Sequence, residues 1–150
     1  MGGPTVMPLP CLCASVRRAA RVMSQLYDDS IRPTGVRGAQ FTLLQALSGA
    51  GPLTQRDLGQ ALAIDATTLS RTLRTVEAAG WITRVPGADR RERRLAVTDS
   101  GIERLAASQA VWKDLQDRLR QQLGDDRWAD LMAACDAVTG MALKASEATA

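Results

Sequence analysis

The sequence predicts a mainly α-helical fold that carries a small β-hairpin, an α+β arrangement. Three observations support this fold class. Two short helical patterns lie close together near the middle of the chain, a hairpin with alternating apolar and polar residues follows them, and long amphipathic patterns occupy both ends. The order helix, short turn, helix, two-stranded hairpin is that of a winged helix-turn-helix, in which the hairpin is the wing.

The two central helices have clear start and stop signals. The first is predicted over residues 55–62, because Thr54 can serve as its N-cap. The second is predicted over residues 66–79, with Asp65 as its N-cap and Gly80 as the residue that ends it. Apolar residues that recur at i, i+4 and i+7 predict its buried face: Leu69, Leu73 and Val76.

The wing is predicted from alternation on both sides of a turn. Residues 81–85 and 93–97 alternate apolar and polar side chains, and residues 86–92 form the loop between them. We expect Leu53 to add a single strand residue beside this hairpin.

Further helical patterns surround this centre, over residues 10–31, 40–47, 99–123 and from 125 or 126 to about 141. Pro10 suits the first turn of the first pattern, and Pro33 and Gly35 end it. Thr98 can cap the third pattern, and Gly124 separates the last two.

The exposed faces of the second central helix and of the wing carry groups that suit duplex DNA. Short hydroxyls and arginines on the helix can reach phosphate oxygens and base edges in a major groove. These candidate contacts are Thr67, Thr68, Ser70, Arg71 and Arg74. The wing loop offers arginines whose guanidinium groups suit a narrow minor groove or phosphates: Arg90, Arg91 and Arg93. An isolated arginine run would indicate only a solvated hairpin, whereas the helix directly upstream favours DNA.

The charge is distributed unevenly along the chain. Residues 1–53 and 54–98 each carry a net charge of +3, whereas residues 99–150 carry −3. The C-terminal helices are therefore expected to do something other than contact DNA. Because no apolar run is long enough to span a bilayer and residues 1–10 lack a charged signal-peptide start, we expect a cytoplasmic protein with no membrane partner and with reduced cysteines.

Residues 89–101 read DRRERRLAVTDSG: Asp, any residue, Arg, and then a short strand that ends in Val-Thr-x-x-Gly. This run resembles the wing signature of the MarR family of bacterial transcription regulators, and residues 69–73 and 76–82 resemble the recognition helix of that family and its exit. The resemblance covers nearly the whole chain. It implies a regulator, more often a repressor than an activator, in which Arg91 enters the minor groove while Asp89 holds it in place. Glu92 departs from the small residue often found at its position.

The terminal helical patterns have more apolar surface than one small winged domain needs for its own core. The family resemblance implies that they interlock with a second copy, so that the homodimer reads a pseudo-palindromic operator. We therefore predict a single domain over residues 1–150. Within it, about residues 10–35 and 99–148 form the dimerisation helices, and about residues 36–98 form the DNA-binding lobe. A monomer with a long helical hairpin is the alternative.

A small aromatic or phenolic effector is expected from the same resemblance, bound between the helical dimer base and the winged lobes. Trp81 is better explained as a core residue. Trp112 and Trp128 could line a pocket, although aromatic residues at helical spacing are usually packing. Arginines of the first helix could pair with a carboxylate ligand, although a solvated helix face also explains them: Arg17, Arg18 and Arg21.

Cys13 has two interpretations. Aligned N–H groups at a helix start can lower the pKa of a thiol, and this position resembles the reactive cysteine of the peroxide-sensing OhrR branch of the family. Tyr27 matches one activating tyrosine of that branch, whereas Arg17 and Gly38 stand where others would be. The other interpretation is a small buried hydrophobic residue. The nearby Cys11 shares the helix start.

The sequence argues against an enzyme, a cofactor and a metal site. With no histidine among its 150 residues, catalytic triads, Cys-His pairs and His-metal chemistry are excluded. No glycine-rich phosphate loop precedes a helix. Three cysteines alone do not complete a four-ligand zinc site. A winged module that binds protein remains the other alternative, and the salt dependence of binding separates it from DNA recognition.

Overall fold

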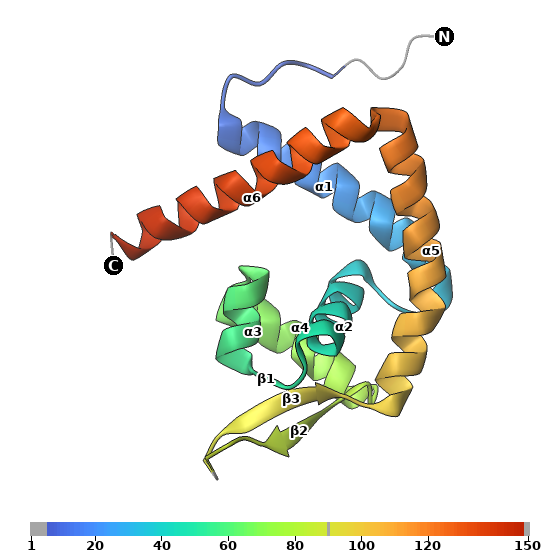
Figure 1. Ribbon diagram of the computed structural model, residues 1–150, viewed down its shortest axis with the longest axis vertical. Helices are drawn as coiled ribbons and strands as arrows, with labels where there is room; N and C mark the ends of the chain where they lie inside the picture. Colours follow the sequence, from blue (N-terminus) through green and yellow to red (C-terminus); the bar gives the residue numbers. More distant parts are fainter. Residues whose placement is uncertain (1–5, 90, 149–150) are drawn as a thin grey trace. The chain divides into compact units, whose positions relative to one another are not determined.

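The computed structural model describes residues 6–89 and 91–148 and confirms the predicted fold class (Figure 1). Its elements, in chain order, are α1 (Leu12–Ile31), the 3₁₀ helix η1 (Arg32–Thr34), α2 (Gly38–Ala50), β1 (Leu53–Thr54), α3 (Gln55–Leu62), α4 (Ala66–Ala78), β2 (Ile82–Pro86), β3 (Arg93–Val97), α5 (Asp99–Leu123) and α6 (Asp125–Glu147). Every helix of the described residues is too short or too polar to cross a lipid bilayer.

The chain divides into two compact units. The first, residues 1–112, contains α1 to β3 and the first half of α5. The second, residues 113–150, contains the rest of α5 and α6. The assignment of the terminal helices to dimerisation and of residues 36–98 to a DNA-binding lobe stays a prediction.

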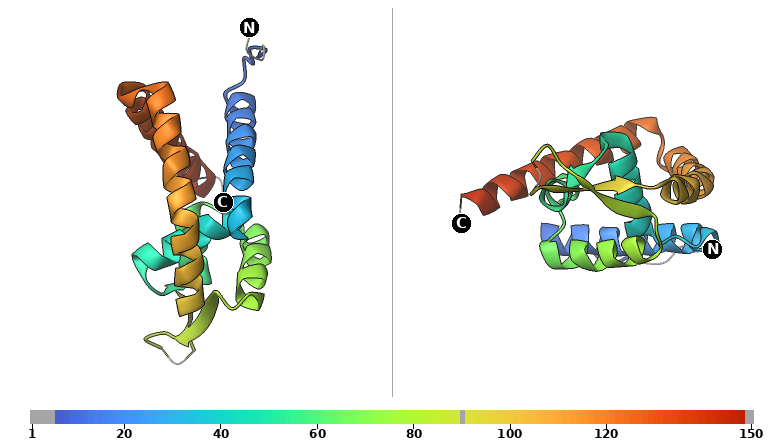
Figure 2. Two further views of the ribbon diagram at one scale, coloured as in Figure 1. Left: turned by 90° about the vertical axis from the view of Figure 1, so that its right-hand side faces the viewer. Right: turned by 90° about the horizontal axis from the view of Figure 1, so that it is seen from below.

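The sheet of the first unit is antiparallel, with the strand order β1-β3-β2. Leu53 pairs with Leu95, which confirms the expected strand residue beside the wing, and Thr54 continues the strand. The first hairpin strand begins at Ile82, one residue later than predicted. Trp81 is excluded from it because its N–H bonds the Val76 carbonyl and so belongs to the exit of α4. The hairpin extends beyond the helices of this unit (Figure 2, left).

The helix starts near the centre of the chain follow the predicted caps. Thr54 accepts a hydrogen bond from the Asp57 N–H at 3.1 Å, and Asp65 caps α4 in the same way. Gly80 has a φ of +73°, a left-handed conformation that suits glycine after a helix end.

Two helices in the N-terminal part have bounds that differ from the predictions. Helix α1 begins at Leu12 rather than at Pro10, and α2 runs over Gly38–Ala50 rather than over residues 40–47. The earlier start of α2 is explained by Asp28, whose Oδ1 atom accepts a hydrogen bond from the Gly38 N–H at 2.6 Å. A carboxylate from a different helix thus satisfies the first turn of α2.

The core of the first unit lies between α2, α3, α4 and the sheet. It is built mainly from aliphatic side chains that are at most 4% exposed, among them Leu43, Leu44, Leu47, Leu58, Leu69, Leu73, Val76, Ile82 and Leu95. The predicted buried face of α4 is therefore confirmed. Trp81 packs against this core, as expected.

The wing is fixed to its neighbours at a junction around Thr98. The Thr98 hydroxyl donates to the Gly80 carbonyl at 2.6 Å and accepts from the Gly101 N–H at 3.1 Å, while the Thr98 N–H donates to the Trp81 carbonyl at 3.0 Å. Gly101 is buried there, and a Cβ atom at this residue would lie 2.1 Å from the Trp81 oxygen. The exit of α4, the end of β3 and the first turn of α5 therefore meet without room for a side chain.

Candidate nucleic-acid interface

The start of α4 is held by a cap that also uses a predicted contact residue. Asp65 Oδ1 accepts from the Thr68 N–H at 2.9 Å, and Asp65 Oδ2 accepts from the Thr68 hydroxyl at 2.6 Å. These hydrogen bonds, the one from the hydroxyl most of all, lower the pKa of Asp65, so the capping carboxylate stays ionised to a lower pH than that of an ordinary aspartate. The Thr68 hydroxyl is therefore engaged within the protein.

The exposed face of α4 forms an open groove of about 450 Å³. Its lining consists of Ala66, Thr67, Ser70, Arg71 and Arg74, so the fold brings together four of the five residues of α4 that were predicted to contact DNA. All five lining residues are exposed. A shallow surface with hydroxyls and guanidinium groups side by side can donate hydrogen bonds to phosphates and base edges.

Gln55, which the sequence did not indicate, contacts a residue of this groove. Its side-chain amide donates to the Ser70 hydroxyl at 3.0 Å and thus links the first turn of α3 to the face of α4. No local pattern indicates this contact, because one polar residue at a helix start has many possible partners.

The arginines of α4 differ from Arg84 of β2 in whether an acidic side chain pairs with them. Within the described part of the chain, no acidic group forms an ion pair with Arg71 or Arg74. Arg84, in contrast, pairs with Glu77 at 2.7 Å between Nε and Oε1, which joins β2 to the end of α4. The charges of Arg71 and Arg74 therefore remain available to an external anion.

The loop of the wing is shaped by Asp89. Its Oδ1 atom accepts a hydrogen bond from the Arg91 backbone N–H at 3.1 Å, and its carbonyl accepts one from the Glu92 N–H at 2.9 Å. Asp89 thus fixes the backbone of Arg91 and leaves its guanidinium group exposed. The predicted contact Arg90 lies outside the described residues.

Glu92, the departure from the family signature, forms an ion pair with Arg94. The Arg94 Nε and Glu92 Oε1 atoms are 2.5 Å apart, and Arg94 also donates to the Pro52 carbonyl at 3.3 Å. This pair removes one positive and one negative charge from the wing. Arg91 and Arg93 remain exposed and have no ion-pair partner among the residues of the wing that the structure describes.

The residues that the sequence left open as ligand contacts lie in different places. Arg17, Arg18 and Arg21 line one hollow of α1, in which Arg18 donates to the Met7 carbonyl at 2.6 Å. Trp112 lines a different pocket, and Trp128 belongs to the second unit. The structure therefore does not bring the arginines of α1 to the pocket that contains Trp112.

Cys13 is exposed on the first turn of α1, so its interpretation as a small buried residue is wrong for the single protomer. Cys11 precedes the helix and is also exposed. The described residues contain no group of three or more histidine, cysteine or acidic side chains that could hold a metal ion.

A helix-turn-helix whose second helix exposes Arg71 and Arg74, followed by a basic β-hairpin, defines the chain as a winged helix protein. The model of the MarR family matches residues 34–92, which include α2, α4 and most of the wing. The chain belongs to the MarR family.

Several relatives support this membership. The uncharacterized HTH-type transcriptional regulator YwoH of Bacillus subtilis is 30% identical over 87 residues, which are 58% of this chain and 64% of that protein. The chain thus spans less than two thirds of the length of this relative. The M. tuberculosis transcriptional regulator MosR has a TM-score of 0.77 at 29% identity, over 91% of this chain and 97% of that one.

Two similar structures contain DNA. MosR in complex with DNA has a TM-score of 0.70 at 30% identity, over 85% of this chain and 98% of that one. A mutant MarR from E. coli, complexed with operator DNA, has a TM-score of 0.75 at 26% identity, over 85% of this chain and 92% of that one.

Proposed function

We propose that this protein is a sequence-specific DNA-binding transcription regulator, acting as a homodimeric repressor that responds to a small effector. One observation carries the proposal: the open groove of α4, which gathers Thr67, Ser70, Arg71 and Arg74, lies in the same unit as a wing on which Arg91 and Arg93 are exposed. The DNA complexes of MosR and of E. coli MarR support it.

In the proposed complex, α4 and the wing contact different parts of the DNA. Helix α4 enters the major groove, where Arg71 and Arg74 contact base edges or phosphates and the hydroxyls of Thr67 and Ser70 add hydrogen bonds. Arg91 enters the minor groove, whose narrow form concentrates negative potential. Arg93 contributes a phosphate contact that positions the wing without reading sequence.

The homodimer is supported by apolar side chains that the protomer leaves exposed. On α1 these are Leu12, Val16, Val22, Met23 and Leu26, and on α6 they are Leu131, Met132, Met141 and Leu143. An apolar surface of this extent indicates an interface. Two copies of α4 placed roughly 34 Å apart would read successive major grooves on one side of the duplex.

We expect the protein to sediment with a mass near twice the 16.1 kDa of one chain, because the apolar faces of α1 and α6 are buried only when two copies assemble. Analytical ultracentrifugation over a range of protein concentrations measures this. A mass of one chain at every concentration would contradict the dimer.

DNA binding itself is expected to be strongly dependent on salt. If each protomer neutralises about three phosphates, the logarithm of the association constant should fall with the logarithm of the salt concentration with a slope of about −5. The measurement is a fluorescence anisotropy titration with duplexes recovered by the protein from genomic fragments. Recovery of no fragment above a random background, or an affinity that is independent of salt, would favour a protein-binding module instead.

A role of Cys13 as a thiol sensor of the OhrR type is a second candidate, favoured by one observation. The thiol is exposed at the first turn of α1, where an oxidant can reach it. Tyr27, the tyrosine expected to support such chemistry, lines a pocket whose lining does not include Cys13. The redox role therefore stays a prediction.

A further inference from the structure

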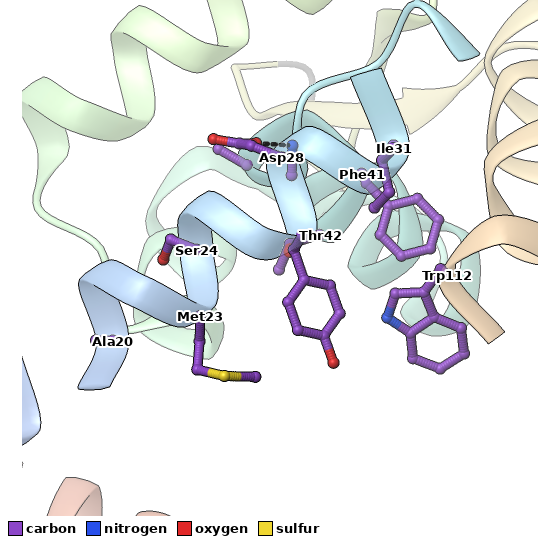
Figure 3. Close-up of a pocket in the computed structure, with 11 residues that line it drawn as sticks. Ala20, Met23, Ser24, Asp28, Ile31, Phe41, Thr42 and Trp112 are labelled. Atoms are coloured by element: carbon purple, nitrogen blue, oxygen red, sulfur yellow. Dashed lines mark hydrogen bonds between the residues drawn. The ribbon is translucent and has the colours of Figure 1, made fainter. Parts of the chain in front are cut away.

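A pocket of about 490 Å³ lies within the first unit, between α1, α2 and Trp112 (Figure 3). This volume suits a small organic molecule. Among the described residues that line it, Asp28 is the sole charged side chain, and no arginine or lysine contributes. Because this charge is negative, it favours cationic ligands over anionic ones.

One side of the pocket is aromatic. Phe41 and Trp112 are in contact, with ring centroids 5.8 Å apart and planes tilted by 35°. Tyr27 also lines this pocket, and Met23, one helical turn before it on α1, lines it as well (Figure 3). Burial raises the pKa of Tyr27, so its hydroxyl is neutral throughout the physiological range. Such rings present negative faces, which attract cations.

The carboxylate of Asp28 adds to this preference. Its Oδ1 atom accepts the hydrogen bond from the Gly38 N–H, while Oδ2 has no hydrogen-bond partner among the described residues. An aromatic acid that entered here would meet a carboxylate and aromatic faces but no basic group. Removing a carboxylate from water without a cationic partner is costly, whereas an ammonium group would gain both an ion pair and cation–π contacts.

We propose that this pocket binds an aromatic ligand with a positively charged nitrogen and discriminates against aromatic acids. The inference rests on the proposed effector-responsive function and specifies the class of effector. Arg17, Arg18 and Arg21, which the sequence left open as partners of a carboxylate ligand, line a different hollow.

Three probes of one shape and different charge test this inference. The full-length protein is titrated calorimetrically with 1-naphthylmethylammonium, 1-naphthalenemethanol and 1-naphthoate. We expect the ammonium compound to bind about tenfold more tightly than the alcohol, and the carboxylate to bind most weakly. Equal affinities, tighter binding of naphthoate, or no binding of any probe would each overturn the proposal.

Asp28→Asn keeps an oxygen that can accept from Gly38 but removes the charge. We expect it to reduce the preference for the ammonium probe over the alcohol to about twofold, the part due to the aromatic rings. Asp29→Asn is the matched control, because Asp29 is exposed, pairs with Arg32 and does not line the pocket, so the tenfold preference should persist. An unchanged preference in Asp28→Asn, or an equal loss in both variants, would refute the role of Asp28.

Tyr27→Leu provides a second variant in case Asp28→Asn fails to fold. It should weaken binding of the ammonium probe more than binding of the alcohol probe. Equal weakening of the binding of the two probes would count against the aromatic contribution.

Duplex binding is measured in parallel without any probe. If the unmodified protein does not bind duplex DNA, the proposed function is contradicted. If it binds duplex DNA but shows no preference among the probes, only this inference is contradicted.

Discussion

Alanine at position 101 is expected to lower the free energy of unfolding by about 3 kcal/mol or more. The added Cβ atom would lie 2.1 Å from the Trp81 carbonyl oxygen and 2.7 Å from a methyl group of Val97. The closest atom belongs to the backbone and accepts the hydrogen bond from the Thr98 N–H, so it cannot move without breaking the junction. Urea denaturation followed by tryptophan fluorescence measures the change.

Gly49→Ala is the matched control for this substitution. Gly49 is exposed within α2, a Cβ atom added to it would meet no atom within 4 Å, and its φ is not positive. Alanine should therefore raise the free energy of unfolding by about 0.5–1 kcal/mol. If Gly101→Ala were as stable as Gly49→Ala, the close approach of α5 to the exit of α4 would be wrong.

Arg91→Ala is expected to weaken operator binding by about 1–3 kcal/mol, because the guanidinium group proposed to enter the minor groove is lost from both protomers. The fold should be unaffected, since the Arg91 side chain is exposed and Asp89 bonds only its backbone. The measurement is the anisotropy titration at fixed salt, with the slope against salt as a second readout.

Arg32→Ala removes the same charge from an exposed residue of η1 that pairs with Asp29 and serves as the control. Its affinity for the operator should stay close to that of the unmodified protein. Arg91→Lys separates charge from shape, and a partial recovery is expected because lysine keeps the charge without the planar group. Equal affinities of Arg91→Ala and Arg32→Ala would remove Arg91 from the interface.

Local signals made much of the fold predictable. Thr54, Asp65 and Thr98 cap helices through their own side chains within three residues, and the strand over 93–97 has the predicted bounds. The face of α4 was predictable for the same reason, since helical periodicity places Thr67, Ser70, Arg71 and Arg74 together.

Features that depend on distant parts of the chain could not be predicted in this way. The start of α2 is set by Asp28, ten residues earlier on another helix, and the ion pair of Glu77 with Arg84 forms only when β2 folds back on α4. Gln55 reaches Ser70 across the turn between α3 and α4. The charge of the pocket beside α1 likewise depends on which side chains the fold brings together.

The two hydrogen bonds of the Thr98 hydroxyl affect how the neighbouring elements can move. Because this one group ties the end of the recognition helix and the base of the hairpin to the first turn of α5, no slack linker separates them. A displacement of that turn therefore moves the C-terminal end of α4 and the base of the hairpin together. In the proposed homodimer, α4 and the base of the wing would therefore move together in each subunit, and the proposed effector would change the affinity for DNA by altering the separation of these paired elements between the two subunits.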